Sequence, residues 1–265
     1  MRVAAIQMSS GADLAENLRE AEALLEAAAR ERAELVLLPE NFGLMGMRAR
    51  DKLDVREQDG DGPQQSLLAR MATRHRQFVI GGSVPLASGD PGRVRQALLA
   101  YGPDGTRVAR YDKIHLFRFT QGDEDYDEAR TIEAGSAPAS FAAPCGRVGL
   151  SICYDLRFPE LYRRMGDLAL IVVPAAFTAT TGEAHWETLL RARAIENQCY
   201  VLASAQSGTH PGGRRTWGHS MLVDPWGTIV ASRPEGPGVV VGDIDPARVA
   251  DVRARLPALA HRTLG

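Results

Sequence analysis

Three reactive side chains each follow a segment that is expected to form a β-strand. Glu40 comes just after LVLLP, Lys113 just after RVARYD, and Cys153 ends GRVGLSIC. A cysteine nucleophile needs thiolate character, a nearby base and groups that stabilise a developing oxyanion. A buried carboxylate with a raised pKa can take the thiol proton, and a nearby lysine lowers the pKa of the thiol. We therefore predict one nucleophilic site built from these three strand ends.

The sequence contains no recognised histidine signature for a reactive cysteine and no metal-binding or nucleotide-binding motif. None of the six histidines falls in a papain-type or caspase-type signature, and no HExxH occurs. His115 comes two residues after Lys113, and we expect it to act as a structural hydrogen-bonder. GxGxxG and Walker A patterns are absent as well. We therefore predict neither a metal nor another cofactor. The alternative for Cys153 is a small buried hydrophobe, as free cysteines often are.

The elements that must position these side chains alternate between apolar strands and helical segments. We expect strands at 3–8, 33–41, 78–86, 146–153, 168–177, 200–206 and 238–245, and hairpins at 94–113 and 219–232. We expect helices at 14–33, 63–76, 158–166, 182–199 and from about 246. This alternation predicts an α/β fold with helix-covered sheets. We predict one domain over 1–265, with a core at about 1–245 and a C-terminal helix and tail at 246–265.

Three polar segments are predicted to be long loops, at 48–63, 118–135 and 207–218. Loops of this length in a compact domain are often lids or binding loops. We interpret the first as a surface excursion.

Composition and charge argue against several classes of protein. A net charge of −2 gives no bulk attraction to nucleic acid or to an anionic membrane. The first residues read as a strand and not as a signal peptide, and no apolar run reaches the length of a membrane span. We therefore expect a cytoplasmic protein. The three cysteines are irregularly spaced, which disfavours disulfides and zinc knuckles, and we interpret Cys145 and Cys199 as structural.

LLPEN with Glu40, YDKIHLF with Lys113 and GLSICYDLRFPE with Cys153 resemble the three catalytic motifs of the nitrilase superfamily, the carbon–nitrogen hydrolases. YDEARTIEAG resembles the family segment that supplies a second active-site glutamate, here Glu128. The resemblance spans residues 2 to about 260. It implies a four-layer α-β-β-α sandwich that pairs through its outer helices into homodimers or larger homo-oligomers.

The resemblance also implies a mechanism. Glu40 takes the proton of Cys153, whose thiol attacks an amide carbon. Lys113 and the backbone N–H of Tyr154 stabilise the oxyanion. An amine or ammonia leaves, and Glu40 activates the water that hydrolyses the thioester. Glu128 positions Lys113 and the substrate amide; its alternative is an exposed acid in an acidic loop.

Segments 181–201 and 217–238 resemble the deaminated-glutathione amidases and their sister group, the ω-amidases that act on 2-oxoglutaramate. This implies a small α-keto acid amide as substrate. Arg157 matches a carboxylate-binding position of the family, with a salt bridge to Asp155 or Glu160 as the alternative. The predicted substrate-binding set is completed by Tyr154, Phe177 and Trp217. Arg214 and Arg215, on the same glycine-rich loop as Trp217, fit either a substrate carboxylate or a solvated loop tip, and we favour the tip.

Other functions fit parts of the sequence. A carbamoylase or a nitrilase would share the Cys-Glu-Lys set. A catalytically dead scaffold protein would have lost a catalytic residue, whereas all of them are present. A redox-sensing protein would need an exposed thiol of low pKa.

Overall fold

The computed structural model describes residues 1–122 and 124–263. Asp123, within the predicted 118–135 loop, and the last two residues of the predicted tail lie outside this range.

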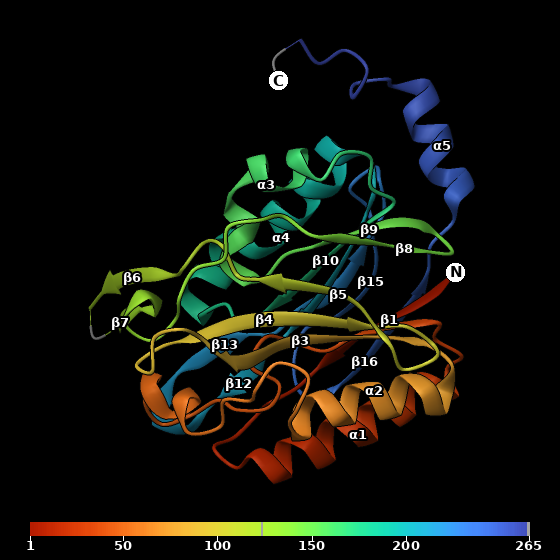
Figure 1. Cartoon of the computed structure of the whole chain (residues 1–265). Helices are drawn as coiled ribbons and strands as arrows, with labels where there is room; N and C mark the ends of the chain where they lie inside the picture. The colour runs from red at the N-terminus through yellow and green to blue at the C-terminus, as the bar shows by residue number, and fades with distance from the viewer. Residues whose placement is uncertain (123, 264–265) are drawn as a thin grey trace.

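Two six-stranded sheets form the centre of the molecule (Figure 1). The strands of the first, in spatial order, are β16 (Gly238–Asp243), β1 (Arg2–Gln7), β2 (Leu35–Leu37), β3 (Phe78–Ala87), β4 (Val94–Tyr101) and β5 (Arg107–Asp112). Those of the second are β15 (Ile229–Arg233), β14 (Ser220–Val223), β11 (Tyr200–Ala205), β10 (Leu170–Ala175), β9 (Gly146–Leu150) and β8 (Ser140–Ala143).

Helices cover the outer face of each sheet. The first sheet is covered by α1 (Leu14–Arg30) and α2 (Pro63–His75), and the second by α3 (Pro159–Arg164) and α4 (Ala179–Asn197) (Figure 1). The last helix, α5 (Pro246–Arg255), follows β16. Asp13 caps α1 through the N–H of Glu16, because its carboxylate accepts one of the unpaired donors of the first turn. The layers are therefore α-β-β-α, which confirms the predicted fold class.

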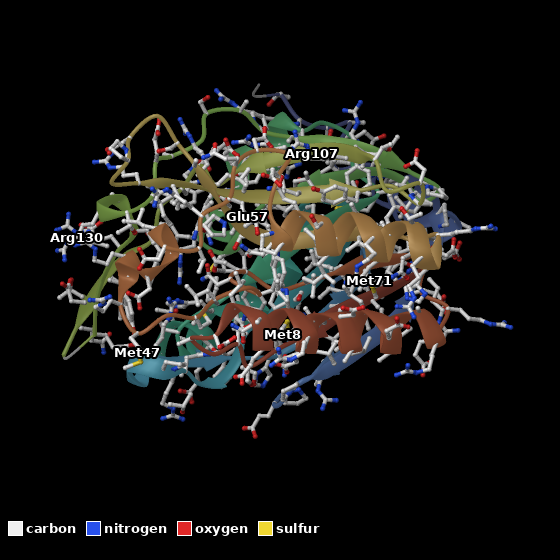
Figure 2. All side chains as sticks on the ribbon, turned by 60° about the horizontal axis from the view of Figure 1, so that its bottom comes forward. Met8, Met47, Glu57, Met71, Arg107 and Arg130 are labelled. Carbon is white, nitrogen blue, oxygen red and sulfur yellow. The ribbon has the colours of Figure 1, made fainter. Side chains whose placement is uncertain are left out.

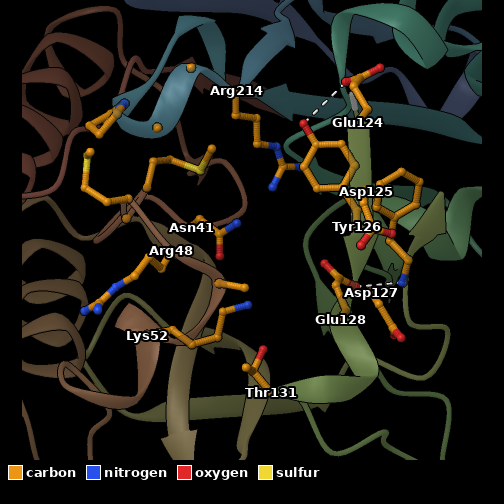
Figure 3. Close-up of a pocket in the computed structure, with 18 of the residues that line it drawn as sticks. Asn41, Arg48, Lys52, Glu124, Asp125, Tyr126, Asp127, Glu128, Thr131 and Arg214 are labelled. Atoms are coloured by element: carbon orange, nitrogen blue, oxygen red, sulfur yellow. Dashed lines mark hydrogen bonds between the residues drawn. The ribbon is translucent and has the colours of Figure 1, made fainter. Parts of the chain in front are cut away.

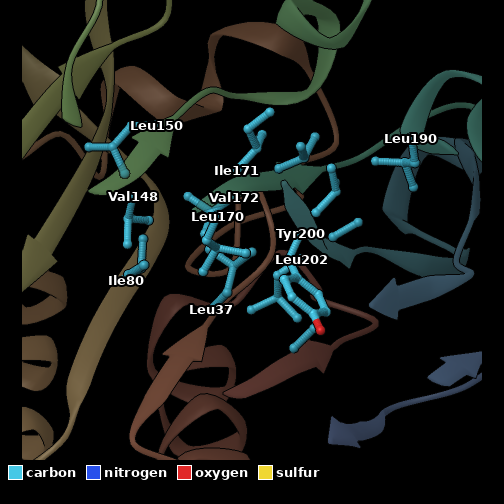
Figure 4. Close-up of a cluster of buried hydrophobic side chains, with 14 of the residues drawn as sticks. Leu37, Ile80, Val148, Leu150, Leu170, Ile171, Val172, Leu190, Tyr200 and Leu202 are labelled. Carbon is cyan, nitrogen blue, oxygen red and sulfur yellow. The ribbon is translucent and has the colours of Figure 1, made fainter. Parts of the chain in front are cut away.

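The alternation of side chains along a strand explains why both faces of the first sheet are apolar. On β1, Val3 and Ala5 belong to the cluster between the two sheets, whereas Ala4 and Ile6 pack with α1 and α2. Figure 4 shows the intersheet cluster, in which Leu37 and Ile80 of the first sheet lie near leucines and valines of the second. In Figure 2, Met8 and Met71 lie inside the molecule and Arg130 extends outward. The core thus has three layers, one between the two sheets, one between the first sheet and α1 with α2, and one between the second sheet and α3 with α4.

Strand direction brings the predicted reactive residues to one end of the sandwich. Strands β2 and β3 are parallel, and β5 runs with β3 because β4 is antiparallel to both. Strands β9, β10 and β11 are parallel to one another. A parallel bridge between Met8 and Gln206 joins the ends of β1 and β11 and fixes the common direction of the two sheets. The carboxyl ends of β2, β5 and β9 therefore face the same edge.

The predicted loops contain short elements of their own. The 118–135 segment forms the hairpin of β6 (Arg118–Gln121) and β7 (Glu124–Asp127), followed by a 3₁₀ turn at Glu128–Arg130. The 207–218 segment forms β12 (Ser207–Thr209) and β13 (Arg215–Trp217) around a turn at Pro211–Gly213. Residues Ala49–Leu53 of the first segment form a 3₁₀ helix. These hairpins are polar and two-stranded, so they lack the apolar alternation that identifies a strand in sequence.

No helix among the described residues combines the length and apolarity required to cross a membrane.

Candidate active site

Cys153 lies in a strained turn just beyond strand β9. The strand ends at Leu150, and Cys153 begins a 3₁₀ turn that runs to Arg157. The expected strand 146–153 is therefore shorter than predicted. Cys153 has a φ of 50°, in the left-handed region that non-glycine residues rarely adopt. Such a conformation costs about 1–3 kcal/mol and persists where the surroundings hold it, often at functional sites.

Asp155 holds this turn in place. Its side chain is fully buried, and one carboxylate oxygen accepts hydrogen bonds from the Tyr111 hydroxyl at 2.8 Å and the Ile152 N–H at 2.9 Å. The other oxygen accepts the His115 N–H at 3.0 Å and lies 2.7 Å from His115 Nδ1. The His115 ring also stacks on Phe158, with 3.7 Å between ring centroids. The expectation that His115 is a structural hydrogen-bonder is confirmed.

Lys113 lies between two carboxylates. Its Nζ donates to Glu40 Oε1 at 2.8 Å and lies 2.8 Å and 3.0 Å from the two oxygens of Glu128. The second oxygen of Glu40 accepts the N–H of Ala176 at 2.9 Å, and Glu128 also accepts the N–H of Phe117 at 2.8 Å. The Glu128 side chain is 17% exposed. The alternative of Glu128 as an exposed acid is therefore wrong.

The buried charges set the protonation of the site. Burial lowers the pKa of Lys113, but the carboxylates of Glu128 and Glu40 outweigh it and raise the pKa above its ordinary value. Burial raises the pKa of Glu128, and Lys113 with Lys52 reverses this, so its pKa is lowered. Burial and the carboxylate of Glu40 raise the pKa of the Cys153 thiol, and Lys113 only partly opposes them. The resting site therefore holds the Lys113 ammonium, the Glu128 carboxylate and a neutral Cys153 thiol.

Two adjoining cavities reach this cluster. The smaller is lined by Cys153, Tyr154, Arg157, Phe177 and their neighbours. The larger has a volume of about 690 Å³ and extends between the loop after β2, the β6–β7 hairpin and the β12–β13 turn (Figure 3). Both cavities are lined in part by Phe117, Glu128 and Arg214. A molecule of drug-like size fits such a volume. The path from Cys153 therefore leads outward past these shared residues.

The predicted substrate-binding residues divide into two groups. Arg157, Tyr154 and Phe177 line the small cavity, where the guanidinium carbon lies 5.7 Å from the Tyr154 ring centroid and 5.3 Å from that of Phe177. Among the described residues, Arg157 forms no salt bridge, and the hydrogen-bond partner of its guanidinium is the ring nitrogen of His185, at 3.3 Å. Its predicted alternative, a pair with Asp155 or Glu160, is therefore wrong.

Trp217 lies elsewhere. It lines neither cavity, stacks on the His219 ring with 4.4 Å between ring centroids, and occupies the space where Gly182 of α4 lacks a side chain. Its position gives no support to the predicted contact with substrate.

Two cations of the cavity wall were not predicted as site residues. Arg214 donates to the carbonyl oxygen of Ala176 at 2.6 Å and lies over the Tyr126 ring, so the favoured interpretation as a solvated loop tip is wrong. Lys52 lines the large cavity from a segment that we interpreted as a surface excursion. The motifs and strand patterns contain no signal for Lys52, whereas the glycine-rich loop had suggested a substrate carboxylate as one partner for Arg214. No cluster of three or more potential metal ligands occurs in the described part of the chain.

Comparison with known proteins defines the class of protein. The model of the carbon–nitrogen hydrolase family matches residues 2–254, and the chain belongs to this family. It is 44% identical over 265 residues to the deaminated glutathione amidase of Synechocystis sp. (strain PCC 6803 / GT-S), covering 98% of this chain and 97% of that protein. It is 35% identical over 265 residues to omega-amidase NIT2 of Homo sapiens, covering 98% of this chain and 94% of that protein.

A solved structure gives the same result for the fold. Saccharomyces cerevisiae Nit3, a member of branch 10 of the nitrilase superfamily, matches with a TM-score of 0.88 and 29% identity, covering 100% of this chain and 97% of that one. The predicted superfamily is confirmed, as is the prediction of an enzyme that hydrolyses carbon–nitrogen bonds.

Proposed function

We propose that this enzyme is an amidase that hydrolyses deaminated glutathione, the α-keto acid amide formed when glutathione loses its α-amino nitrogen. Relatives named deaminated glutathione amidase, at 44% and 40% identity, support this substrate. The products are 2-oxoglutarate and cysteinylglycine. No metal and no other cofactor is required by this chemistry.

The catalytic roles follow from the geometry. Because the Cys153 thiol is neutral at rest, it needs a base as it attacks the amide carbon, and Glu40 beside it accepts that proton. The carbonyl oxygen becomes an oxyanion, which the Lys113 ammonium and the N–H of Tyr154 stabilise. That N–H lies in the first turn of the 3₁₀ segment, where helical N–H groups lack an intrahelical acceptor.

Glu40 then returns the proton to the leaving nitrogen, the carbon–nitrogen bond breaks, and a thioester on Cys153 remains. A water molecule that gives a proton to Glu40 attacks the thioester, the carbon–sulfur bond breaks and the acid is released, and Glu40 returns the proton to the Cys153 sulfur. Glu128 keeps Lys113 in place through both of its oxygens.

The observation that carries the substrate assignment is the pair of adjoining cavities. Arg157, which lines the small cavity and forms no salt bridge with any described residue, suits the carboxylate of the 2-oxoacid half, because a guanidinium binds a carboxylate through two parallel hydrogen bonds. The large cavity of about 690 Å³ leaves room for a leaving group much bigger than ammonia.

Omega-amidase activity on 2-oxoglutaramate is the second candidate, supported by the 35% identity to human omega-amidase NIT2 and by Arg157 alone.

The test is a comparison of the two amides by one common product. Release of 2-oxoglutarate is measured from deaminated glutathione and from 2-oxoglutaramate at equal concentrations, with Cys153→Ala as the blank. We expect a kcat/KM at least tenfold higher for deaminated glutathione. A preference for 2-oxoglutaramate would make the enzyme an ω-amidase, and activity on neither amide would refute the substrate class.

The assembly and location are also part of the proposal. We propose a single domain that forms a homodimer or larger homo-oligomer in the cytoplasm. Ile195 on α4 and Trp226 in the β14–β15 turn are 49% and 50% exposed, which supports contact through the outer face of the second sheet. The molar mass in solution, from light scattering, tests this; a monomer at micromolar concentration would contradict it.

A further inference from the structure

Lys52 is a half-buried cation without a partner. It lines the large cavity from the 3₁₀ helix Ala49–Leu53, and its side chain points into the cavity in Figure 3. It forms no hydrogen bond or ion pair with any described residue. Burial lowers the pKa of Lys52, Glu128 opposes this, and Lys113 and Arg214 lower the pKa further. An anion beside Lys52 would replace the solvation that the ammonium has lost.

Three of the four other cations of the wall are already paired. Arg48 bonds Asp51 at 2.9 Å, and its side chain points away from the centre of the cavity in Figure 3. Arg130 pairs with Asp127 at 3.5 Å. Arg214 is fixed to the Ala176 carbonyl at the junction with the small cavity. In the described structure, Lys52 and Arg215 are therefore the cations of this wall that have no hydrogen-bond or ion-pair partner, and of the two Lys52 is half-buried whereas Arg215 is exposed.

Thr131 supplies a second, independent sign of a ligand at this place. It is 7% exposed, its hydroxyl oxygen has no hydrogen-bond partner within the described chain, and it lines the same cavity. Figure 3 shows its side chain beside that of Lys52. Buried polar groups nearly always have a partner, so the unpaired hydroxyl of a cavity-lining residue points to a ligand or water that reaches it.

We propose that Lys52 and Thr131 form the subsite for a carboxylate at the far end of the leaving group, which for deaminated glutathione is the glycyl carboxylate. This deepens the proposed function and rests on it. Arg157 binds the carboxylate of the 2-oxoacid half of the substrate, and Lys52 binds the carboxylate of the leaving dipeptide. The subsite thus selects amides whose leaving amine ends in a carboxylate over amides that release ammonia.

The dimensions fit this arrangement. Two residues of extended chain reach about 7 Å from the scissile nitrogen to the terminal carboxylate. Lys52 lies near enough to Glu128 and Lys113 to change their electrostatics, yet it touches neither. The large cavity, which Glu128, Thr131 and Lys52 line together, has room for a dipeptide that extends from the scissile nitrogen past Glu128.

The test removes the positive charge of Lys52 from the enzyme and the negative charge of the glycyl carboxylate from the substrate, first separately and then together. Lys52→Met is compared with the unaltered enzyme on deaminated glutathione and on its analogue in which the glycyl carboxylate is a primary amide. We expect Lys52→Met to lower kcat/KM for the acid about tenfold or more, mainly through KM. On the amide analogue, the two enzymes should differ by less than about threefold.

Three further variants separate this subsite from other effects. Lys52→Arg should restore at least half of the preference for the acid, and Thr131→Val should lower that preference severalfold. Arg48→Met removes a paired cation of the same wall and should leave the acid-to-amide ratio within about twofold of its original value. An equal loss on both substrates in Lys52→Met would overturn the subsite, because Lys52 would then act through Glu128. Failure of the unaltered enzyme to cleave either substrate would instead refute the proposed function.

Discussion

Replacing Asp155 by asparagine tests whether the strained turn at Cys153 depends on one buried carboxylate. Two backbone N–H groups donate to the Asp155 carboxylate, that of Ile152 to one oxygen and that of His115 to the other. Asparagine offers one oxygen and one NH₂ group in the same space. Whichever way the amide is placed, one of the two N–H groups faces another donor. The Tyr111 hydroxyl and the His115 ring can reorient, but a backbone N–H cannot.

The cost can be worked out from these contacts. A buried N–H left without an acceptor costs about 1–3 kcal/mol, and each bond that a charged acceptor made is worth about 1.5–3 kcal/mol. Asp155→Asn should therefore lower the free energy of unfolding by about 3 kcal/mol. The turn would also shift the Cys153 sulfur, and a misplacement of about 1 Å can lower kcat about a hundredfold.

The measurement is urea unfolding followed by tryptophan fluorescence, together with kcat on deaminated glutathione. Asp112→Asn on β5 is the matched control, because Asp112 pairs with Arg110 near the surface and its loss should cost less than about 1 kcal/mol. A loss below about 1 kcal/mol in Asp155→Asn, with kcat intact, would refute the argument that this carboxylate holds the turn.

Three further changes test other parts of the site. Glu128→Gln should destabilise the protein by about 3 kcal/mol, because it removes one of the two carboxylates on the buried Lys113. The pKa of Glu128 is lowered in the folded protein, so its stabilisation is present above the unfolded value of about 4.3 and lost as pH falls through the folded one. The difference between Glu128→Gln and the unaltered protein in urea should therefore be constant from about pH 5 to about pH 9 and shrink below about pH 4; a constant difference throughout would contradict it. Arg157→Lys should lower kcat/KM for both amides about tenfold, since lysine cannot form the two parallel bonds of a guanidinium; an unchanged value would exclude Arg157 from carboxylate binding. Tyr111→Phe should cost about 1.5 kcal/mol in urea unfolding, because it removes one donor to Asp155, and a neutral effect would show that the hydroxyl is dispensable.

Local sequence patterns predicted the elements that position the reactive residues. The apolar run before Glu40 and the one that leads to Cys153 form β2 and the strand β9, which lie in different sheets. Their convergence was predicted from the chemistry, because a thiol, a carboxylate and an ammonium fit together in one site. The common direction of the two sheets, which places these strand ends at one edge, is a tertiary feature. The left-handed backbone of Cys153 was not predictable, since the turn is held by Asp155, whose carboxylate also accepts hydrogen bonds from the distant Tyr111 and His115.

The residues that shape the cavities depend on contacts between distant segments. Lys52 is a charged residue in a polar stretch, a pattern typical of solvated loops, and only the folded chain brings it near Glu128. Trp217 is the reverse case. An aromatic residue on a glycine-rich loop suggests ligand binding, yet the absence of a side chain at Gly182 gives it a packing site on α4. Neither the position of Lys52 nor that of Trp217 can be recognised from the local periodicity of the sequence.

The central claim is that Cys153 carries the acyl group during turnover. Mixing the enzyme with deaminated glutathione, quenching in acid within the first turnovers and measuring intact mass tests it most directly. We predict an adduct with the mass of one 2-oxoglutaryl group, located on the peptide that contains Cys153 and absent from Cys153→Ala, which should release no 2-oxoglutarate. Continued 2-oxoglutarate release by Cys153→Ala, or the same adduct on another residue, would contradict the account.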